Sequence, residues 1–347
     1  MRLTAEGAAA RAVWHRVLPD DPAATVSQTP AWMDCACASG RWEDATRAYE
    51  TDRGRDLVLP LARRVHTPAA FAVEASMPFA WGTGGLLTAG GHVTAADVAA
   101  VAADLCRARP IRATLRPAPA ADAAWSSGMP PQAIRTRRMS QSVDLGGGFA
   151  EVAARFSSST RRNIRKAERG DIAVEWQAGT RLVPVFDDLY RAAVARWAEA
   201  QHEPEALARW RARRRDPRSK FESVAARLGP GCRIGVAWRA GEPAAAIVVL
   251  THGEHTTYWR GAMRRELAEG TGANELLHQH AIEEACEAGR RWYHMGDSAP
   301  SSSLAEFKRR LGAREEPYTG YRIERWPLTA AENAVRGAVK RALRFRD

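Results

Sequence analysis

The sequence has no long hydrophobic run and few cysteines, and each shortage excludes a class of protein. No stretch approaches the roughly 18 consecutive apolar residues of a membrane-spanning helix, and no apolar signal segment follows Met1. The five cysteines are scattered, form no Cys-x-x-Cys pair and have no matching pair of histidines. We therefore expect no membrane segment, no disulfide scaffold and no metal site, and the cysteine usage indicates a reducing, cytoplasmic environment.

Lysine is also scarce. Only Lys166, Lys220, Lys308 and Lys340 occur among the 51 basic residues, and all the others are arginine. This bias is typical of a GC-rich genome. A site that needs a compact ammonium group cannot use arginine instead, so the four lysines are of interest.

Basic charge is concentrated in the second part of the chain. Residues 1–150 hold 16 basic and 14 acidic residues, a net charge of +2, whereas residues 151–347 hold 35 and 26, a net charge of +9. Such a positive field favours polyanions such as tRNA, nucleotides, the phosphates of CoA or an acidic membrane surface. Codon usage explains the excess equally well, so charge alone leaves the partner open.

The length of 347 residues suffices for two domains with hydrophobic cores, and both halves alternate strand-like and helix-like segments. In the first half we expect strands at residues 55–61, 111–116 and 140–145 and a helix at 94–109. The glycines at 146–148 favour a domain boundary near residue 148.

The second half begins with an expected helix at 149–169 and has an antiparallel meander of strands at 233–239, 244–250 and 256–262 at its centre. The other expected elements are a strand at 172–176, helices within 181–228, a helix at 271–288, a strand at 292–295, a helix at 301–311 and a strand at 318–326. These patterns predict a mixed α/β fold of the α+β class, with domains at 1–148 and 149–328. Residues 329–347 are expected to form a basic amphipathic helix that packs on the domain.

A basic segment lies in the expected helix at 149–169. Arg161 and Arg165 stand four residues apart, as do Arg162 and Lys166, so a helix places them in two adjoining rows beside hydroxyl-rich residues. This geometry suits a phosphate group. The alternative, of equal weight, is an ordinary solvated helix face.

A second basic segment, residues 209–220, holds seven basic residues and one acidic residue around Trp210. We expect the Asp216-Pro217 pair to break the helix there. Basic side chains beside a tryptophan are suited to hold an RNA strand. The candidate RNA-binding residues are Arg211, Arg213, Arg214 and Arg215, although codon usage and an exposed loop explain the segment nearly as well.

Polar residues follow two of the expected strands in the second half. A glycine turn with Gly272 and Asn274 precedes a helix, and free N–H groups at a helix start can bind a pyrophosphate. Asp297 follows the strand at 292–295, and Lys308 lies in the next helix. A carboxylate there can accept the proton of an attacking amine, and a lysine can stabilise an oxyanion. The alternatives are a capping role for Asp297 and a surface position for Lys308.

Other catalytic signatures are missing from the sequence. It contains no Gly-x-Ser-x-Gly elbow, no Walker loop and no signature of a Ser-His-Asp or Cys-His triad. His278 and His280 project about 200° apart on a helix, so they form no metal-binding face and we expect them to serve packing.

Five segments of the second half resemble the GNAT superfamily and, within it, the FemAB-like group, whose chains carry two GNAT units in tandem. These segments are residues 161–168, residues 258–262, the helix containing Leu276-Leu277, residues 293–297, and residues 304–313 with the Phe307-Lys308 pair. Their order and spacing over 156–326 are specific. The resemblance implies two tandem GNAT-like domains, each a mixed, mainly antiparallel sheet flanked by helices.

The resemblance also implies acyl transfer to an amine. FemAB-like enzymes take an aminoacyl group from charged tRNA and form an amide on a peptidoglycan precursor or a small metabolite, and no bound cofactor is expected. Carried over by position, Lys308 assists the transition state and Asp297 ends the matching strand. The implied phosphate contacts are Arg161, Arg162, Arg165 and Lys166, and further candidate substrate contacts are Tyr258, Arg260, Gly272 and Asn274.

Two other functions stay open at this point. One is N-acyl transfer from acyl-CoA. The CoA loop of GNAT proteins typically reads Gln/Arg-x-x-Gly-x-Gly/Ala, and here Leu267 stands at its leading polar position. The other is a non-catalytic protein that binds RNA or an anionic surface with the same fold. The FemAB-like motifs and the basic second half favour the aminoacyl transferase.

Overall fold

The computed structural model describes residues 1–68, 71–108 and 110–342, with side chains described as far as residue 335. The chain divides into two compact units. The first consists of Met1–Met139 and Glu316–Thr329, and the second consists of Ser140–Glu315 and the chain from Ala330.

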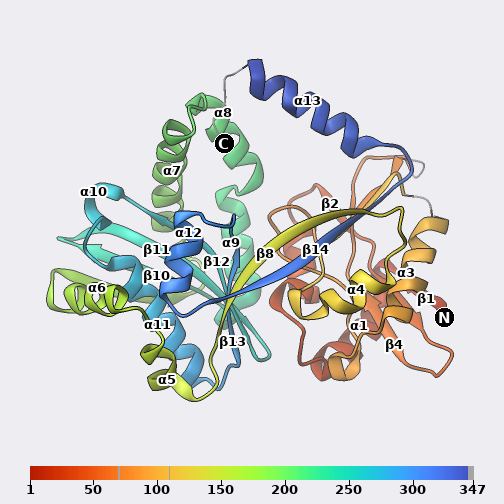
Figure 1. Cartoon of the computed structure of the whole chain (residues 1–347), viewed down its shortest axis with the longest axis horizontal. Helices are drawn as coiled ribbons and strands as arrows, with labels where there is room; N and C mark the ends of the chain where they lie inside the picture. The colour runs from red at the N-terminus through yellow and green to blue at the C-terminus, as the bar shows by residue number, and fades with distance from the viewer. Residues whose placement is uncertain (69–70, 109, 343–347) are drawn as a thin grey trace. The chain divides into compact units, whose positions relative to one another are not determined.

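The first unit contains two sheets and four α-helices (Figure 1). An antiparallel sheet has the order β1 (Arg2–Glu6), β3 (Arg47–Glu50), β4 (Asp56–Leu59). The other strands follow in the order β2 (Trp42–Asp44), β5 (Ala62–Arg64), β6 (Val73–Ser76), β7 (Arg112–Leu115), β14 (Arg314–Glu324). The helices are α1 (Arg11–Val17), α2 (Pro30–Cys37), α3 (Ala95–Ala108) and α4 (Asp122–Gly128). As expected, α3 buries an apolar face.

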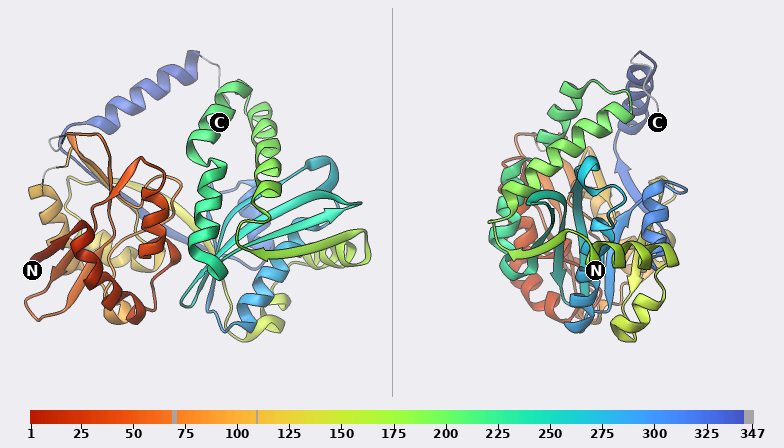
Figure 2. Two further views of the ribbon diagram at one scale, coloured as in Figure 1. Left: turned by 180° about the vertical axis from the view of Figure 1, so that it is seen from behind. Right: turned by 90° about the vertical axis from the view of Figure 1, so that its left-hand side faces the viewer.

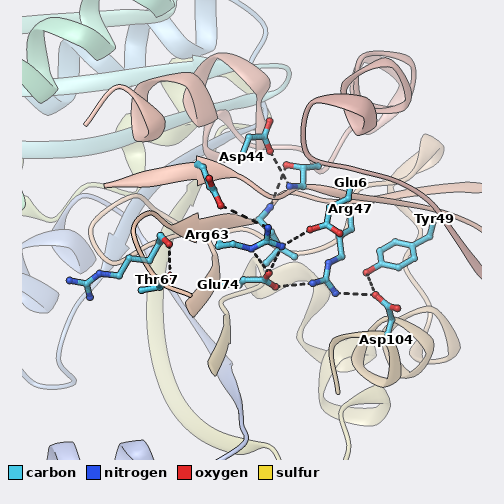
Figure 3. A network of polar contacts seen from close by, with 12 residues as sticks. Glu6, Asp44, Arg47, Tyr49, Arg63, Thr67, Glu74 and Asp104 are labelled. Atoms are coloured by element: carbon cyan, nitrogen blue, oxygen red, sulfur yellow. Dashed lines mark hydrogen bonds and ion pairs between the residues drawn. The ribbon is translucent and has the colours of Figure 1, made fainter. Parts of the chain in front are cut away.

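A buried ionic network joins the elements of the first unit, as Figure 3 shows. The Arg47 side chain on β3 is 3% exposed and donates to Glu74 on β6 and to Asp104 on α3, each at 3.0 Å. Arg63 on β5 donates to the other oxygen of Glu74 at 2.8 Å. Because each buried charge has an oppositely charged partner, the network holds the two sheets and α3 together, and removing one partner is costly.

The second unit is a mixed sheet with helices on both faces. Its strands follow in the order β8 (Ile134–Asp144), β13 (Trp292–Asp297), β12 (His255–Met263), β11 (Glu242–His252), β10 (Cys232–Arg239), β9 (Ile172–Ala178). Only β12 and β13 pair in parallel; the other neighbours are antiparallel. The expected meander at the centre of this unit is therefore confirmed.

Two groups of helices cover this sheet. One face carries α5 (Gly148–Ala154), α6 (Ser158–Arg169) and α11 (Ala273–Glu287), and the other carries α7 (Val183–Ala200), α8 (Glu205–Arg215) and α9 (Arg218–Leu228) (Figure 2). The side chains of β11 alternate accordingly, since Ile247 and Val249 pack in the core beneath α11 while Val248 and Leu250 are buried on the other face. The remaining helices are α10 (Arg265–Ala268), α12 (Ser303–Arg310) and α13 (Leu328–Ala342).

Two sequence-based expectations differ from the structure. The helix expected at 149–169 is two helices, because the Ser157 hydroxyl accepts the Thr160 N–H and starts α6 there. The residues expected as one domain at 149–328 are divided, because β14 pairs with β7 and places 316–329 in the first unit. The expected C-terminal helix is observed as α13, and its basic side chains lie outside the described ones.

The described residues contain no helix that is long and apolar enough to cross a membrane. They also contain no group of three or more histidine, cysteine, aspartate or glutamate side chains placed to hold a metal ion.

Candidate active site

The parallel strands β12 and β13 separate halfway along their length. The paired stretch begins where His255 lies opposite Trp292 and ends where Thr257 lies opposite His294. Beyond this point β12 stays with β11 as far as Met263, and β13 stays with β8 as far as Asp297. Each strand has an irregularity where they part, with Trp259 the extra residue in β12 and Met295 the extra residue in β13. Such bulges bend strands and redirect side chains, and they are frequent beside active sites.

Lys308 reaches the end of β13 from the neighbouring helix. The Ser302 hydroxyl accepts the Ala305 N–H and starts α12, which turns Lys308 inward so that the residue is 1% exposed. Its Nζ donates to the carbonyl oxygens of Gly296 at 2.8 Å and Asp297 at 3.1 Å. Burial lowers the pKa of Lys308 to about 8, although the nearby Asp297 opposes this shift. The amine is therefore mostly protonated at neutral pH, and an ammonium group has a third N–H beyond the two that these carbonyl oxygens accept.

Asp297 lies beside Lys308 at the end of β13, but its side chain faces solvent. It is the last residue of β13, and its exposed side chain leaves the strand beside the buried ammonium group. The structure thus brings Lys308 and Asp297 together, as the sequence predicts. At one strand end, a cation can stabilise an oxyanion and a carboxylate can accept a proton.

A cluster of buried and half-buried rings packs behind Lys308. His278 of α11 is 2% exposed, and its Nδ1 lies 2.8 Å from the hydroxyl of Tyr293 on β13. The rings of Tyr258 on β12 and Phe307 on α12 contact the His278 ring edge-on, at 4.7 and 5.4 Å between centroids.

Burial keeps the members of this cluster uncharged. It lowers the pKa of His278 to about 3, assisted by the charge of Lys308, and raises the pKa of Tyr258 to about 12. Sequence reasoning assigned His278 to packing alone and missed its position beside Lys308, because contacts between α11, α12 and β13 leave no local signal.

The glycine turn before α11 is in direct contact with α6. Gly272 has a φ of 82°, and a Cβ atom on it would stand 2.1 Å from the backbone oxygen of Asn163. The Asn163 side chain donates to Glu275 at 2.8 Å, and Lys166 donates to the carbonyl oxygen of Gly270 at 2.5 Å. The turn needs glycine because α6 packs against its backbone. Asn274, the other candidate here, contacts the sulfur of Met263.

The other basic side chains of α6 have two kinds of environment. Arg161 donates to the carbonyl oxygens of Ala154 and Phe156, so it fixes the end of α5. Arg162 and Arg165 are exposed and, among the residues that the structure describes, have no acidic partner. Only these two arginines of the predicted phosphate-binding set extend freely into solvent.

Arg260 and Tyr258 lie on opposite faces of the sheet. An unbroken strand would place both on one face, but the extra residue Trp259 turns Arg260 toward α9. There Arg260 and Lys220 donate to Asp216 at 3.1 and 2.8 Å. Although burial opposes ionisation of Asp216, these two cations hold its pKa below the usual range. Arg260 therefore belongs to an ion cluster behind β12 and does not line a site with Tyr258.

The predicted RNA-binding arginines lie on α8, which ends before Asp216 as expected. Arg211 pairs with Glu203, and Arg215 donates to Asp216 at 2.9 Å. Arg214 stacks over the ring of Trp210, which is 56% exposed, and Arg213 is exposed. Among the described residues Arg213 and Arg214 thus have no acidic partner, and Arg214 lies over an exposed aromatic ring.

The described part of the second unit has a cavity and a groove near these residues. A cavity of about 150 Å³ lies between α6, α11 and α12, and a groove of about 580 Å³ lies between α7, the start of α8 and α10. The cavity is lined by Ser159, Thr160, Asn163, Glu275, Ser303, Glu306, Phe307 and Arg310. The groove carries side chains of both charges, including Arg196, Glu199, Arg265 and Glu266.

Part of the second unit is similar to a known protein family. Residues 154–309 match the family described as "Acetyltransferase (GNAT) domain". No curated protein is detectably similar to the chain.

Several solved structures share the fold. FemX superposes with a TM-score of 0.62 at 12% identity over 93% of this chain and 97% of its own. A conserved protein of unknown function from Bacteroides thetaiotaomicron superposes with a TM-score of 0.55 at 10% identity, over 93% of this chain and 98% of its own. The C-terminal domain (DUF2156) of a putative lysylphosphatidylglycerol synthetase from Agrobacterium fabrum has a TM-score of 0.51 at 11% identity. The match covers 90% of this chain and 92% of that domain. These matches confirm the predicted FemAB-like GNAT fold and its mixed α/β class.

Proposed function

Because residues 154–309 match a GNAT acetyltransferase domain and the chain shares the fold of FemX, we propose that it transfers an aminoacyl group from charged tRNA to an amine and so forms an amide. The acceptor is the amine of a peptidoglycan precursor or of a small metabolite. Since charged tRNA is a cytoplasmic substrate, the reaction belongs to the cytoplasm.

The contact of α6 with the glycine turn carries this proposal. The turn corresponds to the CoA loop of GNAT proteins, and α6 packs on its backbone through Asn163 and Lys166. The leading polar position of that loop is Leu267, and Glu275 adds a negative charge in the first turn of α11. A covered turn with a neighbouring carboxylate is a poor seat for a pyrophosphate, which favours a donor other than CoA.

The residues around Lys308 fit the chemistry of such a transfer. The acceptor amine attacks the ester carbonyl of the aminoacyl group, and the carbonyl oxygen becomes an oxyanion, which accepts the free N–H of Lys308. The attacking nitrogen loses its proton to Asp297 or to water. The C–O bond then breaks, and the ribose oxygen takes up that proton and leaves as a hydroxyl of the tRNA. An ester of this kind is already reactive, so positioning supplies much of the acceleration.

The exposed basic residues suit the RNA part of the donor. Arg162 and Arg165 on α6 are free to bind phosphates, and Arg213 and Arg214 accompany an exposed tryptophan on α8. Such sets of cations and rings bind nucleic acid backbones and unstacked bases.

The GNAT match itself favours acyl-CoA as the alternative donor, and one assay separates the two. Purified protein is incubated with the small-molecule amines of a cell extract and either bulk tRNA charged with labelled amino acids or labelled acetyl-CoA. We expect alkali-stable label from tRNA only, because amides survive the base that cleaves esters. Label from acetyl-CoA alone, or none from any charged tRNA, would overturn the proposal. Lys308→Met is the control for catalysis at this site.

A further inference from the structure

We propose that Gln141 is a positioning residue of the reaction, which holds the ammonium group of Lys308 in its place and in its charged form. Gln141 lies in β8, next to β13, and is completely buried. The effect on the rate of transfer rests on the proposed function, whereas the effect on the charge of Lys308 can be measured without a substrate. Three observations carry the inference: a hydrogen bond to α12, the register of β8 with β13, and an amide oxygen to which the described residues donate no hydrogen bond.

The side-chain amide of Gln141 ties α12 to β8. Its Nε2 donates to the carbonyl oxygen of Ala305 at 3.0 Å. Ala305 stands three residues before Lys308 and both are buried, so they share the face of α12 that is turned inward. The hydrogen bond therefore fixes the turn of the helix that carries the ammonium group.

The register of the strands brings Gln141 to Lys308 from the side of the sheet. Gln141 lies opposite Gly296 in the antiparallel pairing of β8 with β13, and Lys308 donates to the carbonyl oxygen of Gly296 at 2.8 Å. Directly opposite residues of antiparallel strands have Cα atoms about 4.5 to 5.5 Å apart. Because Gly296 has no side chain, Gln141 is the residue of this pair that supplies a functional group.

The amide oxygen of Gln141 is buried and accepts no hydrogen bond from the part of the chain that the structure describes. The carbonyl oxygen of Ala305 can only accept, so it commits the amide nitrogen to the helix and leaves the amide oxygen as the other end of the group. A buried acceptor of this kind costs free energy and requires an explanation. The oxygen is the negative end of the amide dipole, and stabilisation of a buried cation such as Lys308 provides that explanation.

The charged and titratable groups around Lys308 leave a role for such a dipole. Asp297 on β13 favours the charged form of Lys308, and burial opposes it. Burial keeps the titratable side chains of α11, β12 and β13 in this cluster uncharged, and these are His278, Tyr258 and Tyr293. The charged neighbours within α12 pair with one another near the surface, and these are Glu306, Arg309 and Arg310. Gln141 is what β8 contributes, and its neutral oxygen supports the ammonium group without adding a charge.

The chain has only four lysines, so the ionisation of Lys308 can be followed directly. In full-length protein labelled with carbon-13 at lysine Cε, the NMR signal of each lysine reports its own titration, and Lys308→Met identifies the signal of Lys308. We expect Gln141→Met, which removes the amide, to lower the titration midpoint of Lys308 by at least about 0.5 pH units. Gln141→Glu, which is nearly the same size and adds a negative charge, should raise it by at least as much.

Ser142→Ala is the matched control. Ser142 follows Gln141 in β8, is also buried, and has a hydroxyl for which the described residues supply no partner. Successive side chains of a strand point to opposite faces, so Ser142 is turned away from Lys308. We expect its removal to leave the midpoint of Lys308 unchanged. An unchanged midpoint in Gln141→Met or Gln141→Glu, or an equal shift in Ser142→Ala, would overturn the inference.

The rate of transfer tests the consequence for the reaction. In single turnover at neutral pH we expect Gln141→Met to lower the rate at least about fivefold, with the affinity for aminoacyl-tRNA within about twofold of wild type. A wild-type rate in Gln141→Met would contradict the positioning role. A lower rate with an unmoved midpoint of Lys308 would show a purely structural role and would also overturn it. If the wild-type protein transfers no amino acid from charged tRNA, the proposed function fails, while the NMR titration still decides whether Gln141 holds the charge of Lys308.

Discussion

Lys308 combines two properties that rarely occur together, complete burial and a positive charge. The cost of burying the ammonium group is offset by two backbone carbonyl oxygens at the end of β13. An arginine is too large and too planar for this position, which gives a physical reason for a lysine in a chain that otherwise uses arginine. Lys308 is therefore suited to hold a single positive charge in a fixed position at the end of β13.

The charge of Lys308 makes the reaction sensitive to high pH. Burial sets its pKa to about 8, so the ammonium group is lost as the pH rises through this value. We expect the rate of transfer to fall above pH about 8 in wild-type protein, and the small residual rate of Lys308→Met to lack this fall because methionine has no charge to lose. Single-turnover rates between pH 6 and 10 measure the effect. An identical profile in both proteins would remove Lys308 from the explanation.

The buried histidines make the fold sensitive to acid. Burial lowers the pKa of His278 and of His294 to about 3, so between pH 6.5 and 3 the unfolded chain binds protons that the folded chain does not. Stability is therefore present above pH 6.5 and is lost as the pH falls. We expect each histidine to lower the unfolding free energy by about 1.4 kcal/mol per pH unit between pH 6 and 4.

Urea unfolding at a series of pH values measures this slope. His278→Gln should reduce it by the share of one histidine, even where the variant is less stable at every pH. The exposed His15 offers a matched control, because His15→Gln should leave the slope unchanged. A full slope in His278→Gln would show that another group causes the acid sensitivity.

Some site residues could be predicted from the sequence and others could not. The proximity of Asp297 and Lys308 follows from local patterns, since Asp297 comes at the end of a strand and Lys308 lies in the next helix. The sequence analysis names Tyr258 and Arg260 as substrate contacts, and alternate residues of a regular strand share a face. The bulge at Trp259 reverses that relation, and a bulge has no clear signature in a single sequence.

At the scale of elements, α6 determines what the glycine turn can do. The sequence predicts one helix at 149–169, and the break at Ser157 frees α6 to lie against the start of α11. This contact joins residues that are distant in the chain, so the sequence gives no sign of it. The sequence therefore predicts a phosphate site at Gly272 and does not predict its contact with Asn163. The structure gives the glycine a packing reason instead.

Two glycines of the turn provide a matched test of this contact. Both have positive φ values, but a Cβ on Gly272 would meet the backbone oxygen of Asn163 at 2.1 Å, whereas a Cβ on Gly270 meets nothing within 4 Å. We expect Gly270→Ala to lower the unfolding free energy by about 1 kcal/mol and Gly272→Ala by about 3 kcal/mol or more. Chemical denaturation measures both. Equal losses would show that α6 yields easily and does not cover the turn tightly.

At the scale of the whole molecule, the net charge of +11 overstates the cationic surface. Within the second unit, hydrogen bonds or ion pairs to carbonyl oxygens, carboxylates or a hydroxyl engage Arg161, Arg211, Arg215 and Arg260. By contrast, Arg162, Arg165 and Arg213 are exposed and have no acidic partner among the described residues. Sequence composition cannot separate these groups, because pairing depends on residues that are distant in the chain. The mixed α/β class was predictable from periodicity, and the return of β14 to the first unit was not.

The exposed arginines predict how tRNA binding depends on salt. Each phosphate contact contributes about 0.7 to the slope of log K against log salt for a single strand. We expect the double variant with Arg162→Gln and Arg165→Gln to reduce the slope by about 1.4. Filter binding or fluorescence titration at several salt concentrations measures this. Arg53→Gln with Arg64→Gln, two exposed arginines of the first unit, is the matched control, and an equal reduction there would contradict the assignment to α6.

The central claim is that the ammonium group of Lys308 serves aminoacyl transfer from tRNA, and single-turnover kinetics test it most directly. Protein in excess over labelled aminoacyl-tRNA is mixed with the acceptor pool, and alkali-stable product is followed over time. We predict transfer by the wild-type chain and a loss of about 100- to 1,000-fold in Lys308→Met, the cost of removing one oxyanion donor, with tRNA affinity retained. Equal rates in the two proteins, or no transfer by the wild-type chain, would contradict the account.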